Sequence, residues 1–158
     1  MAKYTLIFVV VLFLHLTAFA QLAGTVVKVS DGDTFTLLTA ENRQIKIRLH
    51  GVDCPERKQD FGLAAKKFTS DRVAGKIVKV KELDKDRYGR TIGMVYLADG
   101  KILNEELLSA GLAWHYKRYD SSPKWAKLEL QARSGKRGLW RQPNAIAPWE
   151  FRKMKRKK

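Results

Sequence analysis

The chain has 158 residues, with 31 Lys and Arg against 16 Asp and Glu, and a formal net charge of +15. This length favours one domain with a single substantial core, and the excess of positive charge favours polyanionic partners, nucleic acid or an anionic membrane surface. Cys54 is the only cysteine, so an intrachain disulfide framework is excluded and the core alone must hold the fold.

Residues 1–20 are typical of a secretory signal peptide. Lys3 is their only charge, residues 4–20 are almost wholly apolar, and Ala18-Phe19-Ala20 offers a small-x-small cleavage site. An uncleaved anchor is the alternative, but the run is shorter than the roughly 20 apolar residues of a spanning helix. We predict cleavage, leaving a secreted or periplasmic protein of formal charge +14 without Lys3, with no stable membrane association.

Residues 22–49 are predicted to form a three-stranded meander. Residues 22–29 are rich in β-formers and end at an Asp-Gly turn, and residues 34–38 resume the strand pattern. Residues 44–49 alternate polar and apolar side chains, which is typical of a half-buried strand. Pro55 then breaks the pattern, because it excludes the α region for the residue before it.

The remaining elements are mostly helical. Residues 60–75 have a helical apolar period, with Asp60 as the expected N-cap. Two further strands and two further helices follow, at residues 77–80, 91–97, 103–110 and 123–134. Five short strands and few helices favour a small closed barrel of the α+β class, because closure removes exposed edges. We therefore expect one domain over residues 21–142, followed by a basic C-terminal tail, residues 143–158. Within the tail, residues 152–158 carry six basic side chains and no apolar period, which suits electrostatic tethering of nucleic acid.

Carboxylates are scarce in this chain, so their grouping at the turns of one meander is informative. The grouped acids are Asp31, Asp33, Asp53 and Glu56. If the barrel closes, Asp33 and Asp53 lie side by side, where they repel each other unless a cation joins them. Oxygen-only ligands suit Ca²⁺ or Mg²⁺, whereas the softer groups of His50, Cys54 and His115 match no zinc spacing. The simpler alternative is that Asp31-Gly32-Asp33 is only a hairpin turn.

Two arginines and one glutamate complete the candidate chemistry. Arg48 and Arg90 are proposed phosphate clamps, because a guanidinium donates two hydrogen bonds to a phosphodiester that gains negative charge. Glu56 either takes a proton from the attacking water or orients that water beside a metal ion. Cys54 lacks a basic partner at a known spacing, so its backbone carbonyl is of more interest than its sulfur.

Three motifs carry a resemblance to a known family. They are Asp31-Gly32-Asp33-Thr34, the segment from Arg48-Leu49 to Asp53-Cys54-Pro55-Glu56, and Asp86-Arg87-Tyr88-Gly89-Arg90. In order and spacing they resemble those of the thermonuclease, or staphylococcal-nuclease-like, family, and the resemblance runs from about residue 24 to residue 140. It implies a five-stranded oligonucleotide-binding (OB-fold) barrel with three helices. It also implies Ca²⁺-dependent hydrolysis of DNA and RNA, with single strands preferred and 3′-phosphate ends released.

The resemblance also implies roles for individual residues. Asp33, Asp53 and the carbonyl of Cys54 resemble the metal ligands, and Arg48, Glu56 and Arg90 the catalytic set. Arg87, Tyr88 and Tyr116 resemble residues that contact substrate. The chain departs from the family in having Cys54 where a small hydroxyl residue is usual, and in a shorter segment over residues 57–62. We expect a monomeric nuclease; the alternative from another class is a non-catalytic nucleic-acid-binding module of the same fold.

Overall fold

The computed structural model of the chain describes residues 21–156, so the predicted signal peptide lies outside the described residues. The strands of the barrel are β1 (Leu22–Asp31), β2 (Thr34–Leu38), β3 (Gln44–Leu49), β5 (Ile77–Lys85) and β6 (Thr91–Tyr96). The α-helices are α1 (Gly62–Val73), α2 (Leu103–Ser109), α3 (Pro123–Ser134) and α4 (Pro148–Arg156). Two short strands, β4 (Val52–Asp53) and β7 (Trp114–His115), and one 3₁₀ turn, η1 (Gly138–Arg141), complete the described chain.

The five long strands close into a barrel in the order β1-β2-β3-β6-β5, which confirms the predicted OB-like α+β fold. β1 closes the barrel by pairing antiparallel with β5, and β3 pairs in parallel with β6. Successive side chains of β2 and β3 point to opposite faces of the sheet, so Phe35, Leu37 and Ile47 lie in the core, where each is 0 % exposed. The intervening side chains, Arg48 among them, point to the outer face of the barrel.

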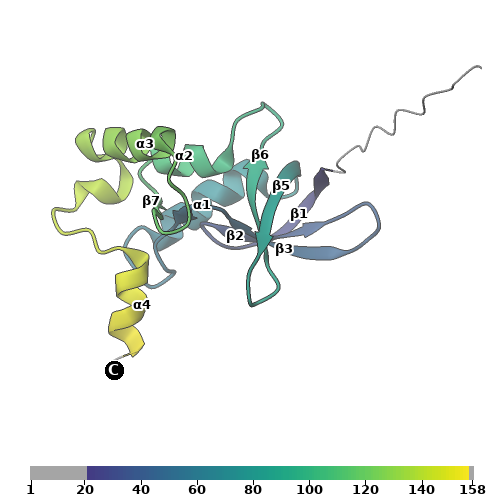
Figure 1. The fold of residues 1–158 in the computed structure, drawn as a ribbon, viewed down its shortest axis with the longest axis horizontal. Helices are drawn as coiled ribbons and strands as arrows, with labels where there is room; N and C mark the ends of the chain where they lie inside the picture. The colour runs from purple at the N-terminus through teal and green to yellow at the C-terminus, as the bar shows by residue number, and fades with distance from the viewer. Residues whose placement is uncertain (1–20, 157–158) are drawn as a thin grey trace, which may run out of the picture.

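The helices cover one end of the barrel and extend its core. α1 packs on β1, and α2 and α3 pack on each other, as Figure 1 shows. Val73, Leu103, Leu107 and Leu108 are each 0 % exposed and join the barrel core. At about 25 cal/mol per Å² of apolar surface, such burial is the main stabilising term for a chain without disulfides. None of the helices between residues 21 and 156 is long and apolar enough to cross a membrane.

Two details differ from the sequence-based expectation. α1 begins one residue later than expected, because Phe61 rather than Asp60 is its N-cap residue, with φ of 64° and no side-chain cap. Asp60 instead accepts a hydrogen bond from Gln142 at 2.7 Å. The second difference is α4, because residues 148–156 form a fourth helix where three were expected and a tail without periodicity was predicted. In Figure 1, α4 stands apart from α2 and α3 on the far side of β7.

Candidate active site

The register of β2 against β3 brings the first acidic motif to the second. Thr34 pairs with Arg48, and the amide of Leu49 donates to the carbonyl of Asp33 at 2.9 Å. The turn before β2 packs tightly, because a Cβ on Gly32 would lie 2.8 Å from that of Cys54 and 2.7 Å from that of Ala65. Only glycine fits this position, so Gly32 lets Asp33 approach the strand end that carries Asp53.

Arg48 is the link between the two predicted metal carboxylates. Its Nη2 lies 3.2 Å from Asp33 Oδ2 and 2.9 Å from Asp53 Oδ1. Its Nη1 donates to the carbonyls of Leu49 and Val52 at 2.9 and 2.8 Å, which fixes the guanidinium plane. Burial alone would lower the pKa of Arg48, but Asp33 and Asp53 raise it, so the side chain stays charged.

The acidic group holds more negative charge than Arg48 alone offsets. Asp33 and Asp53 are 5 % and 1 % exposed. Burial, followed by the repulsion of Asp33, raises the pKa of Asp31 to about 7. Burial also raises the pKa of Asp53, although its hydrogen bond to Arg152 acts in the opposite direction. Carboxylates converging in a poorly solvated place fit a further cation with hard oxygen ligands.

Cys54 contributes its backbone to this arrangement. Its amide donates to Asp33 Oδ2 at 2.7 Å, which aims that carboxylate toward the end of β4. The thiol is 4 % exposed, and burial raises its pKa well above the ordinary value, so it stays protonated and unreactive. Among residues 21–156 there is no group of three or more His, Cys, Asp and Glu side chains arranged to hold a metal ion.

Glu56 stands at the open side of the cluster and has a partner that sequence reasoning missed. Its side chain is 39 % exposed, and its Oε1 lies 2.7 Å from Nη1 of Arg152, in α4. Nη2 of Arg152 also lies 2.8 Å from Asp53 Oδ2. These hydrogen bonds raise the pKa of Arg152 even though burial acts to lower it. The sequence gives only a weak indication of this contact. Pro148 can begin a helix, and Trp149 and Arg152, three positions apart, then lie on one face of it.

Arg90 lies close to Arg48 in the chain path but does not contact Asp33, Asp53 or Glu56. It immediately precedes β6, two residues before Ile92, which is the register partner of Arg48 in the parallel β3–β6 pair. Arg90 Nε lies 2.6 Å from Asp86 Oδ2, and this short-range pair holds it at the edge of the site. Among the described residues, its hydrogen bonds go to Asp86 alone.

The three predicted substrate-binding residues fall in two places. Arg87 and Tyr88 share an exposed turn between β5 and β6, where Arg87 Nη2 donates to the Tyr88 hydroxyl at 2.7 Å. Tyr116 follows β7, whose pairing with β4 sets Trp114 opposite Asp53. Its ring is stacked on Trp149, with centroids 4.8 Å apart and planes within 7°.

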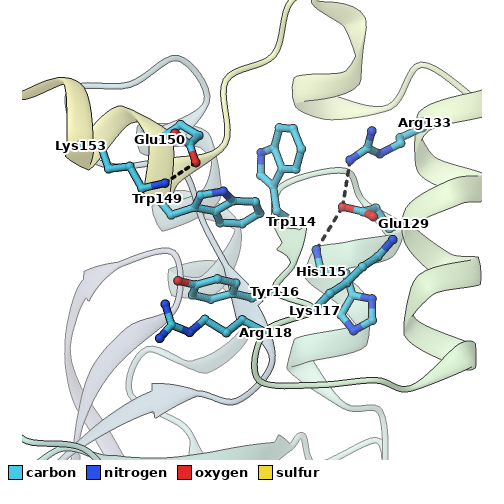
Figure 2. Close-up of a pocket in the computed structure, with 10 residues that line it drawn as sticks. All are labelled: Trp114, His115, Tyr116, Lys117, Arg118, Glu129, Arg133, Trp149, Glu150 and Lys153. Atoms are coloured by element: carbon cyan, nitrogen blue, oxygen red, sulfur yellow. Dashed lines mark hydrogen bonds and ion pairs between the residues drawn. The ribbon is translucent and has the colours of Figure 1, made fainter.

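A groove of about 440 Å³ opens beside this stack, as Figure 2 shows. It is lined by Trp114, Tyr116 and Trp149 together with basic side chains that include Lys117, Arg118 and Arg133. We call it the aromatic groove. Asp33, Asp53 and Glu56 do not line it. His115 does line it, and its Nε2 lies 2.8 Å from an oxygen of Asp120, whose other oxygen is 3.4 Å from Nε2 of His50.

Taken together, a closed five-stranded barrel and buried carboxylates bridged by an arginine at a strand end define an OB-fold protein with an anionic, cation-accepting site. Residues 46–142 match the family described as staphylococcal nuclease homologue. The chain belongs to the staphylococcal nuclease family, as its three motifs predicted.

Several relatives resemble the chain over most of its length. An "uncharacterized endonuclease" of Escherichia coli O157:H7 is 40% identical over 136 residues, which cover 86% of this chain and 88% of the relative. A protein of the same description from Haemophilus influenzae is 39% identical over 98% of this chain and 87% of its own length. The staphylococcal-like nuclease CAN1 of Arabidopsis thaliana is 44% identical over 72% of this chain, but only 35% of its own length is covered.

Proposed function

We propose that this chain is an exported nuclease that uses Ca²⁺ to hydrolyse phosphodiester bonds of DNA and RNA. The observation that carries the proposal is the convergence of Asp33 and Asp53 on one nitrogen of Arg48, beside Glu56. Membership in the nuclease family supports the same reaction class. We further propose that the protein acts as a monomer on single strands and leaves 3′-phosphate ends.

Each residue of the site has a chemical task in this reaction. Asp33, Asp53 and the carbonyl of Cys54 would hold Ca²⁺, which when bound offsets phosphate charge and makes a coordinated water more acidic. Arg48, on β3, and Arg90, just before the adjacent strand β6, would donate to the phosphate oxygens as negative charge develops there. Glu56, the most exposed of the three acids, is placed to accept the proton of the attacking water or to orient it.

Substrate is drawn and held by basic and aromatic side chains. The formal charge of +15 attracts a polyanion over a long range. Exposed Tyr88, with Arg87 beside it, offers a ring face and a cation to an unpaired nucleotide. Tyr116 lines the aromatic groove, where Trp149 covers one face of its ring and the other is proposed to receive a base. Stacking of this kind needs unpaired bases, and this supports the preference for single strands.

The proposed location follows from the N-terminal sequence. Residues 1–20 have the charge, apolar length and small-residue site of a signal peptide. We therefore propose that the mature nuclease works in the periplasm or outside the cell, where Ca²⁺ is more abundant than in the cytoplasm.

A gel assay with single-stranded DNA tests the proposed reaction. The mature chain is expected to degrade the strand with added Ca²⁺ and to stop when a chelator is added. Glu56→Gln and Arg90→Ala are each expected to lower turnover by on the order of 10² or more, because both act as charge moves in the transition state. Glu82→Gln, an exposed acid on β5, is the matched control and should keep full activity.

Two outcomes of this assay would contradict the proposal. If strand binding persists but no cleavage occurs with any divalent ion, the chain is a binding module of the same fold. If both substitutions leave turnover unchanged, the site has been assigned to the wrong residues.

A further inference from the structure

The C-terminal helix α4 contacts the acidic site through Arg152, which lies 96 and 99 residues after Glu56 and Asp53 in the sequence. Arg152 donates from Nη2 to Asp53 Oδ2 at 2.8 Å and from Nη1 to Glu56 Oε1 at 2.7 Å. A third, longer contact joins Nη1 to Asp53 Oδ1 at 3.3 Å. One guanidinium of α4 therefore bridges the proposed metal ligand and the proposed base.

This contact is part of a docked helix. Trp149, three residues before Arg152, stacks on Tyr116. It also contacts Trp114 edge-on, with the two ring centroids 5.6 Å apart. Figure 2 shows these rings packed together where α4 meets the β7 segment. The segment before α4 is also held to the barrel domain, because the carbonyl of Ile146 accepts a hydrogen bond from Gln59 at 2.5 Å.

Arg152 and a divalent cation need the same oxygen atoms. Asp53 Oδ1 already accepts from Arg48 at 2.9 Å, so Oδ2 is the oxygen left for a metal ion, and Arg152 occupies it. The same guanidinium is bonded to the Glu56 oxygen that would meet the attacking water. Two cations on one carboxylate oxygen repel each other, so loading of the metal requires Arg152 to leave.

The ion pairs of Arg152 are exposed enough to break and re-form. The Arg152 side chain is 36 % exposed, against 14 % for Arg48, so solvent screens its ion pairs more strongly. Lys155 and Arg156, one turn further along the helix from Arg152, are also basic, and a phosphodiester would offer these cations a new acceptor. Displacement of α4 is thus favoured by the two components of the reaction, the metal ion and the strand.

We propose that α4 is an autoinhibitory strap, in which Arg152 occupies the carboxylates of the active site until Ca²⁺ and nucleic acid displace it. The inference rests on the proposed nuclease function for its biological meaning, but the competition itself is a property of binding. If α4 is docked in about nine molecules of ten, the apparent affinity for Ca²⁺ is lowered about tenfold.

Calorimetric titration with Ca²⁺ alone tests this competition. Arg152→Gln is expected to bind Ca²⁺ about tenfold more tightly than the unaltered mature chain. The matched control is Arg156→Gln, which removes an exposed cation of the same helix and should leave the dissociation constant within about twofold. Equal or weaker binding by Arg152→Gln, or no binding by any of the three proteins, would overturn the proposal.

Hydrogen exchange of residues 148–156 gives a second readout that needs no catalysis. Saturating Ca²⁺ is expected to speed exchange of these amides, because the helix undocks and frays. Unchanged or slower exchange would mean that α4 stays in place over the metal, contrary to the proposal. Hydrolysis of DNA in excess Ca²⁺ is measured separately, so a chain that binds Ca²⁺ competitively but cuts nothing would refute the nuclease function and leave the strap standing.

Discussion

At the scale of single residues, the site is controlled by the balance of charge around Arg48. Its guanidinium donates from Nη1 to two carbonyls and from Nη2 to Asp33 and Asp53, so both terminal nitrogens are fully used. Desolvation of ions is costly, and the pairing offsets that cost only while both signs are present. Asp31 has neither Arg48 nor Arg152 as a direct partner, and its burial, followed by the repulsion of Asp33, raises its pKa to about 7.

Removal of Arg48 should therefore destabilise the whole fold. Arg48→Ala is expected to lower the free energy of unfolding by about 3 kcal/mol, because it leaves two buried carboxylates without their shared partner. Urea denaturation followed by Trp fluorescence measures this change. The control is Arg43→Ala, whose side chain is 70 % exposed and pairs loosely with Glu41 at 3.8 Å, and it should change stability by less than about 0.5 kcal/mol. Equal effects of the two substitutions would contradict the structural role of Arg48.

At the scale of elements, α2 holds the barrel and the site loop together through one amide side chain. Asn104 is 0 % exposed, its Oδ1 accepts from the amide of Val95 at 3.1 Å, and its Nδ2 donates to the carbonyl of His50 at 2.9 Å. β6 and the turn between Arg48 and Asp53 are thereby fixed to the same helix. The placement of the acids depends on this helix although it carries none of them.

Loss of the Asn104 side-chain amide should lower the stability of the fold. Asn104→Ala is expected to lower the free energy of unfolding by about 3 kcal/mol, because a buried N–H and a buried carbonyl lose their partners. Chemical denaturation monitored by circular dichroism measures it. Gln131→Ala, at an exposed position of α3, is the matched amide control and should be nearly neutral. A neutral Asn104→Ala would show that water replaces the side chain without cost.

At the scale of the whole molecule, charge rather than shape sets the first contact with substrate. The chain carries 31 basic residues, and they are spread over the barrel, the helices and the C-terminal segment. Each phosphate neutralised by a basic residue releases counterions, so binding weakens as salt is added.

Strand binding should accordingly be steeply salt-dependent. With Glu56→Gln, which is expected to cut at least about a hundredfold more slowly, affinity for single-stranded DNA should fall at least about a hundredfold between 50 and 200 mM salt if six phosphates are contacted. Fluorescence anisotropy measures this loss. A peptide nucleic acid of the same sequence has no phosphates and serves as the control. A loss below about tenfold would mean that stacking, not charge, dominates recognition.

The sequence by itself determined the barrel and the core of the candidate site. Strand alternation and turn residues act locally, and the register of adjacent strands follows from them, so the meeting of Asp33, Arg48 and Asp53 was predictable. The tertiary structure alone decided the place of Arg152, which pairs with Asp53 across 99 positions of sequence. Residues 148–156 form an amphipathic helix with Trp149 and Arg152 on one face, but the sequence of the helix does not specify what that face docks against. Docking of this helix depends on an aromatic stack and an acidic pair that exist only once the barrel has closed, and a local pattern contains no information about either.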